Sequence, residues 1–156
     1  MMKKIAFLLF TFLYSTLLFA QTDFSGTWTL NTSKSKLGEQ FSMAPKEVII
    51  LQNGNDISVE KHSEWQGQEF TINDKYTLDG KECINPGFMD TEKKSTLTWD
   101  SGKEVLTITS KIPFQNETMT ITEVYKKDGD SFIVEMKSSS SYGDMEETQV
   151  FDKKQG

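Results

Sequence analysis

The stretch 23-DFSGTWTLNTSKSKLGE-39 begins shortly after an apolar run at the start of the chain. Phe24, Gly26, Trp28 and Leu30 occupy every second position, and serine or threonine stands between them. A period of two places alternate side chains on opposite faces of a β-strand. We therefore predict a strand here, with Trp28 on its buried face, followed by a Ser/Lys-rich exit.

The same period of two recurs along the rest of the chain, and no apolar pattern of period 3.6 persists for three turns. Turn signals, most of them Asn-Gly or Asp-Gly types, separate these alternating segments; they lie at 53–55, 66–68, 79–80, 100–102, 113–116, 127–130 and 142–144. Such signals favour tight hairpins. Successive hairpins make an up-and-down antiparallel meander, and closing it into a β-barrel removes its exposed edges.

The spacing of the turn signals predicts the number of strands. The interval from Gly80 to Gly102 is longer than the others, which indicates an extra strand within it. A meander that pairs its first and last strands antiparallel also needs an even number. We predict ten strands, with eight as the alternative, near 24–31, 46–52, 56–65, 68–78, 81–85, 93–99, 103–112, 115–126, 131–141 and 145–152.

An even-numbered meander places alternate connections at opposite ends of the barrel. One end collects the short polar turns 53–55, 79–80, 100–102 and 127–130. The other collects 32–45, 66–68, 86–92, 113–116 and 142–144, and it carries an apolar set with Trp65 at its edge: Phe41, Met43, Phe88, Met89, Phe114 and Tyr142. We therefore predict one sealed end and one open mouth with an apolar rim.

The first twenty residues have the layout of a secretory signal peptide. Lys3 and Lys4 form a basic region, residues 5–19 are almost wholly apolar, and Ala20 is a small residue at the expected cleavage point. The run is short for a membrane span of about 20 residues and polar residues interrupt it, so an uncleaved anchor is the less favoured alternative. We expect residues 1–20 to be removed and residues 21–156 to form one secreted or periplasmic domain, with no membrane insertion afterwards.

Composition argues against polyanionic partners. Without Lys3 and Lys4, the chain has 15 lysines against 23 acidic residues, a formal charge of −8, and it contains no arginine. Nucleic-acid binding depends on basic patches and on bidentate guanidinium contacts. We therefore expect no nucleic-acid partner.

With a meandering barrel predicted, the string FSGTW at 24–28 resembles the first strand of the lipocalins and of the wider calycin group, which includes the fatty-acid-binding proteins. The longer string FSGTWTLNTSKSKLG at 24–38 looks like the opening of small secreted bacterial lipocalin-like proteins. The resemblance implies that Trp28 packs across the closed end and that Gly26 lets neighbouring backbone approach.

The chain also departs from this pattern. In lipocalins an arginine of the last strand usually covers the tryptophan; here Lys153 or Lys154 is the candidate for a cation–π contact. The pair of lid helices typical of fatty-acid-binding proteins is not predicted, because residues 32–45 read as a loop.

Two carboxylates interrupt apolar faces and are predicted to point inward, where each could orient a polar group of a ligand. They are Asp74 and Glu123. Aromatic and methionine side chains would supply an adaptable apolar lining, or they would simply fill the barrel. The predicted ligand-binding set is Phe41, Met43, Trp65, Asp74, Tyr76, Phe88, Trp99, Met119, Glu123 and Phe132.

No pattern in the sequence predicts a catalytic, cofactor or metal site. His62 shares a face with Asp56, Glu60 and Glu64, but Ile57 and Val59 claim the inward face, so we interpret this row as solvated. Cys83, the single cysteine, is interpreted as a small buried side chain. Asp74 or Glu123 as an acid or base is the least favoured alternative.

The leading hypothesis is a secreted lipocalin-like barrel that binds a small apolar or amphipathic molecule without catalysis. The second is a protein-interaction or inhibitor module that acts through the loops of the open end, with exposed apolar side chains as anchors.

Overall fold

The computed structural model describes residues 20–156, so the expected signal peptide lies outside the described residues except for Ala20. Ten antiparallel strands and one 3₁₀ turn make up this part of the chain. They are β1 (Gly26–Leu30), β2 (Glu47–Asn53), β3 (Asp56–Trp65), β4 (Gln68–Thr77), β5 (Cys83–Pro86), η1 (Phe88–Asp90), β6 (Glu92–Trp99), β7 (Leu106–Phe114), β8 (Glu117–Asp128), β9 (Ser131–Ser140) and β10 (Gly143–Lys153). No helix within residues 20–156 is long and apolar enough to cross a membrane.

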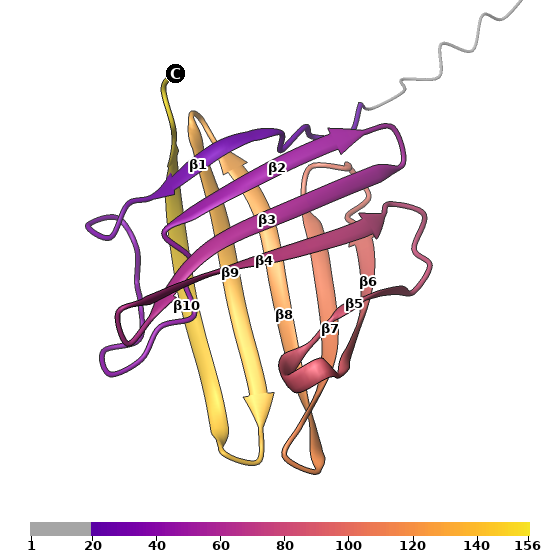
Figure 1. Cartoon of the computed structure of the whole chain (residues 1–156). Coiled ribbons are helices and arrows are strands. Elements are labelled where there is room, and N and C mark those ends of the chain that lie inside the picture. Colours follow the sequence, from indigo (N-terminus) through magenta and orange to yellow (C-terminus); the bar gives the residue numbers. More distant parts are fainter. Residues whose placement is uncertain (1–19) are drawn as a thin grey trace, which may run out of the picture.

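The strands follow one another around a nearly closed barrel in the order β4-β3-β2-β1-β10-β9-β8-β7-β6-β5. The first and last strands pair antiparallel, with Trp28 opposite Lys153 and Leu30 opposite Phe151. Figure 1 shows β1–β4 crossing the direction of β7–β10, so that two halves enclose the interior. The predicted all-β, up-and-down barrel is confirmed, with ten strands rather than eight.

The observed strand ends lie within three residues of those predicted, because the turn residues fix them. Gln66 and Gly67 have φ of 50° and 77°, and Gln115 and Asn116 have 48° and 66°. Two consecutive residues with positive φ form the type I′ turn, which matches the twist of a two-residue hairpin. The predicted division of the connections between two ends is confirmed, because all neighbouring strands but β4 and β5 pair antiparallel.

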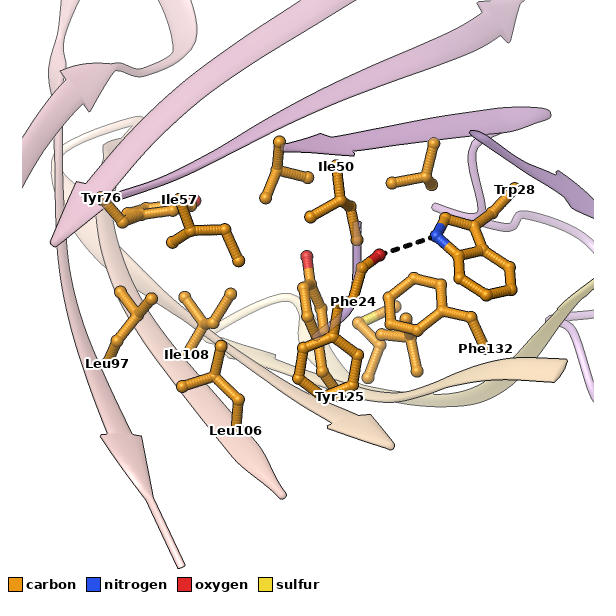
Figure 2. Close-up of a cluster of buried hydrophobic side chains, with 14 of the residues drawn as sticks. Phe24, Trp28, Ile50, Ile57, Tyr76, Leu97, Leu106, Ile108, Tyr125 and Phe132 are labelled. Atoms are coloured by element: carbon orange, nitrogen blue, oxygen red, sulfur yellow. Dashed lines mark hydrogen bonds between the residues drawn. The ribbon is translucent and has the colours of Figure 1, made fainter. Parts of the chain in front are cut away.

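The closed end contains a dense aromatic core. Trp28 is only 1% exposed, and its Nε1–H donates a hydrogen bond of 2.9 Å to the carbonyl oxygen of Phe24 (Figure 2). Phe132 packs against Trp28, Phe24 and Tyr125, with ring centroids 5.5, 5.8 and 5.0 Å apart. Buried aromatic rings contribute large apolar areas, so this core anchors both halves of the barrel.

The segment just before β1 plugs this end. Phe24 is fully buried, and the amide N–H of Thr22 donates to the carbonyl of Lys103. The side chain of Gln52 in β2 accepts a hydrogen bond from the N–H of Phe24 and donates one to the carbonyl of Thr22. Lys127 Nζ donates to the carbonyl of Asp23. The plug is therefore tied to β2, to β8 and to the loop after β6.

Trp28 lies near two lysines. Lys153 Nζ is 5.8 Å from the ring centroid, as expected from the resemblance, and Lys127 Nζ is 5.5 Å from it. Lys154 instead pairs with Glu47 at 2.7 Å. Gly26 has φ of +147°, whereas an added Cβ would meet nothing closer than 3.4 Å. The requirement for glycine there is conformational, which corrects the expected close approach of backbone.

Side chains bridge the one interruption of the sheet, between β4 and β5. Asn85 accepts a hydrogen bond from the N–H of Lys75 through Oδ1 (2.8 Å), and its Nδ2 donates to the carbonyl of Lys75 (3.0 Å). The amide N–H of Thr77 donates to Cys83 Sγ at 3.2 Å. We call this junction the β4–β5 seam.

Candidate functional site

The interior of the barrel carries a layer of charged side chains at mid-height. Lys61 of β3 and Glu123 of β8 form an ion pair, although four strands separate β3 from β8 in the sheet order. This pair therefore crosses the barrel interior. Both side chains remain partly exposed, 17% and 12%, although they face inward. Solvent therefore reaches part of both side chains.

A second ion pair joins β4 to β6 across the seam. Lys93 Nζ lies 2.6 Å from Asp74 Oδ2, and Asp74 is only 1% exposed. Its other carboxylate oxygen, Oδ1, is buried and has no hydrogen-bond partner among residues 20–156. Nearby, the hydroxyls of Ser95 and Ser110 share a hydrogen bond of 2.7 Å. We call Lys61, Asp74, Lys93, Ser95, Ser110 and Glu123 the polar layer.

Burial and mutual charge govern protonation in this layer. Burial would lower the pKa of Lys61, but the negative charges of Glu123 and Asp74 outweigh it and raise that pKa above its ordinary value. Burial, reinforced by the charge of Glu123, raises the pKa of Tyr125, and burial together with Asp74 raises that of Tyr76. Lys61 is therefore charged at neutral pH and both tyrosines are neutral.

Between the polar layer and the mouth, the inward-facing side chains are mostly apolar. In strand register, Ile72 lies opposite Lys61, Ile121 opposite Ser110, and Met119 opposite Ile112. Ile72 and Met119 are half-buried, whereas Ile112 and Ile121 are buried. We call these apolar side chains, together with the polar layer beneath them, the cup.

The rim of the cup carries two aromatic groups. Phe41 of the β1–β2 loop meets Trp65 at the end of β3 edge to face, with centroids 5.0 Å apart. On the other side, Phe114 contacts both Phe88 (5.9 Å) and Tyr142 (6.2 Å). A cavity of about 300 Å³ lies between η1 and the β7–β8 turn, bordered by Phe88 and Phe114.

The long loop between β1 and β2 completes the wall beside β10. Lys36 and Thr148 form an isolated β-bridge. The amide N–H of Gly38 donates to Glu147 Oε1 at 3.0 Å, and Gln149 Nε2 donates to Glu147 Oε2 at 2.9 Å. No helix forms in residues 31–46. A loop held against β10 by these bonds therefore replaces the pair of lid helices typical of fatty-acid-binding proteins, as the sequence predicts.

The structure separates the ten predicted ligand-binding residues by height. Phe41, Met43, Trp65, Phe88 and Met119 lie in the mouth half, and Asp74 and Glu123 lie in the polar layer. Trp99 and Phe132 instead pack in the closed-end core, and Tyr76 is buried beside Ile57 (Figure 2). These three do not join the others in the cup.

Sequence reasoning missed three inward-facing charges, namely Lys61, Lys93 and Glu147. The alternation of inward- and outward-facing residues along each strand could have identified them. Lys61 continues the face of Ile57 and Val59, and Lys93 the face of Leu97, but a lysine in a strand suggests solvent by its residue type. Glu147, 4% exposed, lies opposite Met136 on the buried face of β10.

Neither of the other candidates forms a site. His62 lies on the outer face and bonds Glu60 at 2.6 Å, as the solvated row predicts. Cys83 is half-buried and accepts a hydrogen bond at the seam, so it is not the simple apolar side chain expected. Within residues 20–156, no three His, Cys, Asp or Glu side chains gather closely enough to hold a metal ion.

Comparison with protein-family models and with curated proteins gives no match. Solved structures do match in fold. The SAHS protein of Ramazzottius varieornatus superposes with a TM-score of 0.63 and 20% identity, covering 87% of this chain and 98% of the other. Fatty-acid-binding protein 1 of Echinococcus granulosus gives 0.58 and 14%, covering 83% and 96%. Zebrafish ileal bile acid-binding protein, solved with cholic acid, gives 0.56 and 16%, covering 84% and 98%.

The fold is that of a calycin barrel. These matches span nearly the whole length of each neighbour, and they agree in strand architecture at low identity. Similarity at this level carries the fold alone, because one fold hosts many functions. Any ligand of this chain therefore depends on the side chains of its own barrel.

Proposed function

We propose that this calycin barrel binds a small, partly apolar molecule in the cup at its open end and that no reaction is required. One observation carries the proposal: the Lys61–Glu123 pair crosses the interior beneath apolar walls and stays partly exposed. Pockets with apolar walls and a few convergent polar groups are typical of ligand sites. The named ligands of two neighbours, a fatty acid and cholic acid, are also amphipathic, and this supports the same class here.

Filling the cup tests the proposal. Binding of N-phenylnaphthylamine, a neutral apolar probe, is measured by fluorescence titration. Ile72→Trp places a large ring among the cup walls and is expected to weaken binding at least tenfold. Ile84→Trp is the matched control, because Ile84 lies on the outer face of β5 and is 58% exposed. If both variants bind the probe as the parent does, binding in the cup is refuted.

The natural ligand requires protein from its own source. Native mass spectrometry of that protein is expected to show a small molecule that dissociates on activation. We also propose that the protein is exported after loss of residues 1–20. Amino-terminal sequencing of the mature protein is then expected to begin at Gln21, whereas an intact Met1 would contradict export by cleavage.

A second function is favoured by the apolar rim. Met89 is 90% exposed, Tyr142 69% and Trp65 52%. Large exposed apolar side chains often mark a surface that contacts another protein. An interaction module would bind a partner through this rim. Pull-down from the envelope or the medium, repeated with Phe88 and Phe114 both changed to Ala, checks it: a partner retained by the double variant rules out the rim as the interface.

A further inference from the structure

One carboxylate oxygen of the polar layer, Asp74 Oδ1, bears on which head group a ligand would have. Lys93 engages Oδ2 at 2.6 Å, whereas Oδ1 is buried without any hydrogen-bond partner among the described residues. A buried charged acceptor without a donor carries the full cost of its lost hydration. The Tyr76 phenol, whose pKa is raised by burial and also by a hydrogen bond to Asp74, approaches the same carboxylate, so a donor group of a ligand would add to this contact or replace it.

The balance of inward-facing charge in the mouth half points the same way. Among residues 20–156, Asp74, Glu123 and Glu147 are the acidic side chains there, whereas only Lys61 and Lys93 are basic, and each lysine already pairs with a carboxylate. The donors to Glu147 are the neutral Gly38 N–H and the Gln149 amide, and no lysine ion pair forms with it within residues 20–156. Lys127 and Lys153 lie at the other end, beyond the aromatic core.

A ligand carboxylate would meet unfavourable chemistry in this cup. Each lysine is already neutralised by Glu123 or Asp74, so the charge of the ligand would add to an excess of negative charge without a free cation to offset it, and an uncompensated buried charge is costly. The chain has no arginine that could offer a free bidentate contact. A hydroxyl or ammonium group, by contrast, adds no negative charge, and it can donate to the carboxylates of the polar layer while both ion pairs stay intact.

We propose that the cup selects amphipathic molecules whose polar end donates hydrogen bonds, as an alcohol or an amine does, and disfavours fatty carboxylates. This inference rests on the proposed function, since it assigns the polar end of the ligand to the same cup. The apolar tail lies against Ile72, Ile112 and Met119, and the donor reaches the polar layer. A neighbour named for fatty acids thus shares the fold, whereas the charges here favour another head group.

Ligands of equal chain length isolate the head group. Isothermal titration calorimetry at pH 7 with decanol, decylamine and decanoic acid, each below its aggregation limit, is expected to give Kd values at least tenfold lower for the two donors than for the acid. Decanoic acid that binds as tightly as both donors would overturn the inference while leaving the proposed function standing. Failure of all three to bind, together with no response of the cup to Ile72→Trp, would remove both.

Two variants assign the preference to named groups. Asp74→Asn leaves Lys93 without its carboxylate. It is therefore expected to weaken the binding of decylamine at least tenfold and to strengthen the binding of decanoic acid. Asp144→Asn on the exposed end of β10 is the matched control and is expected to change neither. Glu147→Gln removes a negative charge without breaking an ion pair, and it is expected to weaken the binding of decylamine but not that of decanoic acid. This variant keeps the test available if Asp74→Asn folds poorly. Unchanged decylamine affinity in both Asp74→Asn and Glu147→Gln, each folded by circular dichroism, would refute the assignment.

Discussion

Trp28 combines three contacts that would each be modest alone. Its ring fills the closed-end core, its N–H satisfies the carbonyl of Phe24, and two lysine ammonium groups lie within 6 Å of its centroid. Cation–π contacts contribute about 0.5–1 kcal/mol at exposed sites. The two lysines supply the cation that the resemblance to lipocalins predicts beside this ring, but without the planar stacking of an arginine.

A pair of conservative changes separates the hydrogen bond from the ring. Trp28→Phe leaves the carbonyl of Phe24 without its donor and reduces the volume of the core, so we expect it to lower the free energy of unfolding by about 2–3 kcal/mol. Trp99 Nε1 is buried without a hydrogen-bond partner in the described part of the chain, so Trp99→Phe is expected to cost only about 1 kcal/mol, because it also removes an unsatisfied donor. Urea unfolding measures both, and equal losses would contradict the role of the Trp28 hydrogen bond.

At the scale of elements, the β4–β5 seam is the weakest junction of the barrel wall. Elsewhere, backbone ladders of three to ten residue pairs join neighbouring strands. At the seam, the amide of Asn85 and the sulfur of Cys83 take the place of a ladder. The side-chain amide of Asn85 pairs with Lys75 as a facing backbone unit would.

Replacing Asn85 should therefore loosen the seam selectively. Asn85→Leu leaves the N–H and carbonyl of Lys75 without partners, and we expect about 2 kcal/mol of destabilisation and faster hydrogen exchange at the Lys75 amide. Asn73→Leu is the control, because Asn73 is exposed on the outer face of the same strand; it is expected to change stability by less than about 0.5 kcal/mol. Unchanged exchange at Lys75 in the Asn85 variant would show that the side chain does not hold the seam.

The elements themselves were predictable because their determinants are local. Alternation in β3 and the turn residues at 66–67 and 115–116 fix strand type and ends, and parity then fixes which loops meet. The seam was not predictable, since a side chain that replaces a ladder leaves no period in the sequence. The carboxylates of the polar layer were predicted, but its lysines were missed for a related reason: strand parity places Lys61 inside, and only tertiary pairing with Glu123 makes that position tolerable.

For the whole molecule, the interior protonation pattern predicts loss of stability in alkali. The pKa values of Lys61, Tyr76 and Tyr125 are all raised in the folded barrel. Above pH 10 the unfolded chain loses these protons while the folded chain retains them. The free energy of unfolding therefore falls as pH rises, by up to about 1.4 kcal/mol per pH unit for each group.

Urea unfolding from pH 8 to pH 11.5 checks this expectation. Tyr125→Phe removes one of the three groups, so the fall in stability above pH 10 is expected to become shallower by up to about 1.4 kcal/mol per pH unit. Tyr142 is the control because it is 69% exposed at the rim, and Tyr142→Phe should leave the slope unchanged. A slope identical in the Tyr125 variant and the parent would contradict the contribution of this buried phenol.

The three tryptophans stand at different depths along the barrel axis, and this has an optical consequence. Trp65 is at the rim, Trp99 stacks on the buried plug residue Phe24, and Trp28 lies in the core of the closed end. A molecule that enters the cup changes the surroundings of Trp65 first, whereas unfolding of the closed end reddens the emission of Trp28. Single-tryptophan versions of the protein would thus resolve ligand entry and barrel rupture as separate fluorescence signals, without any added dye.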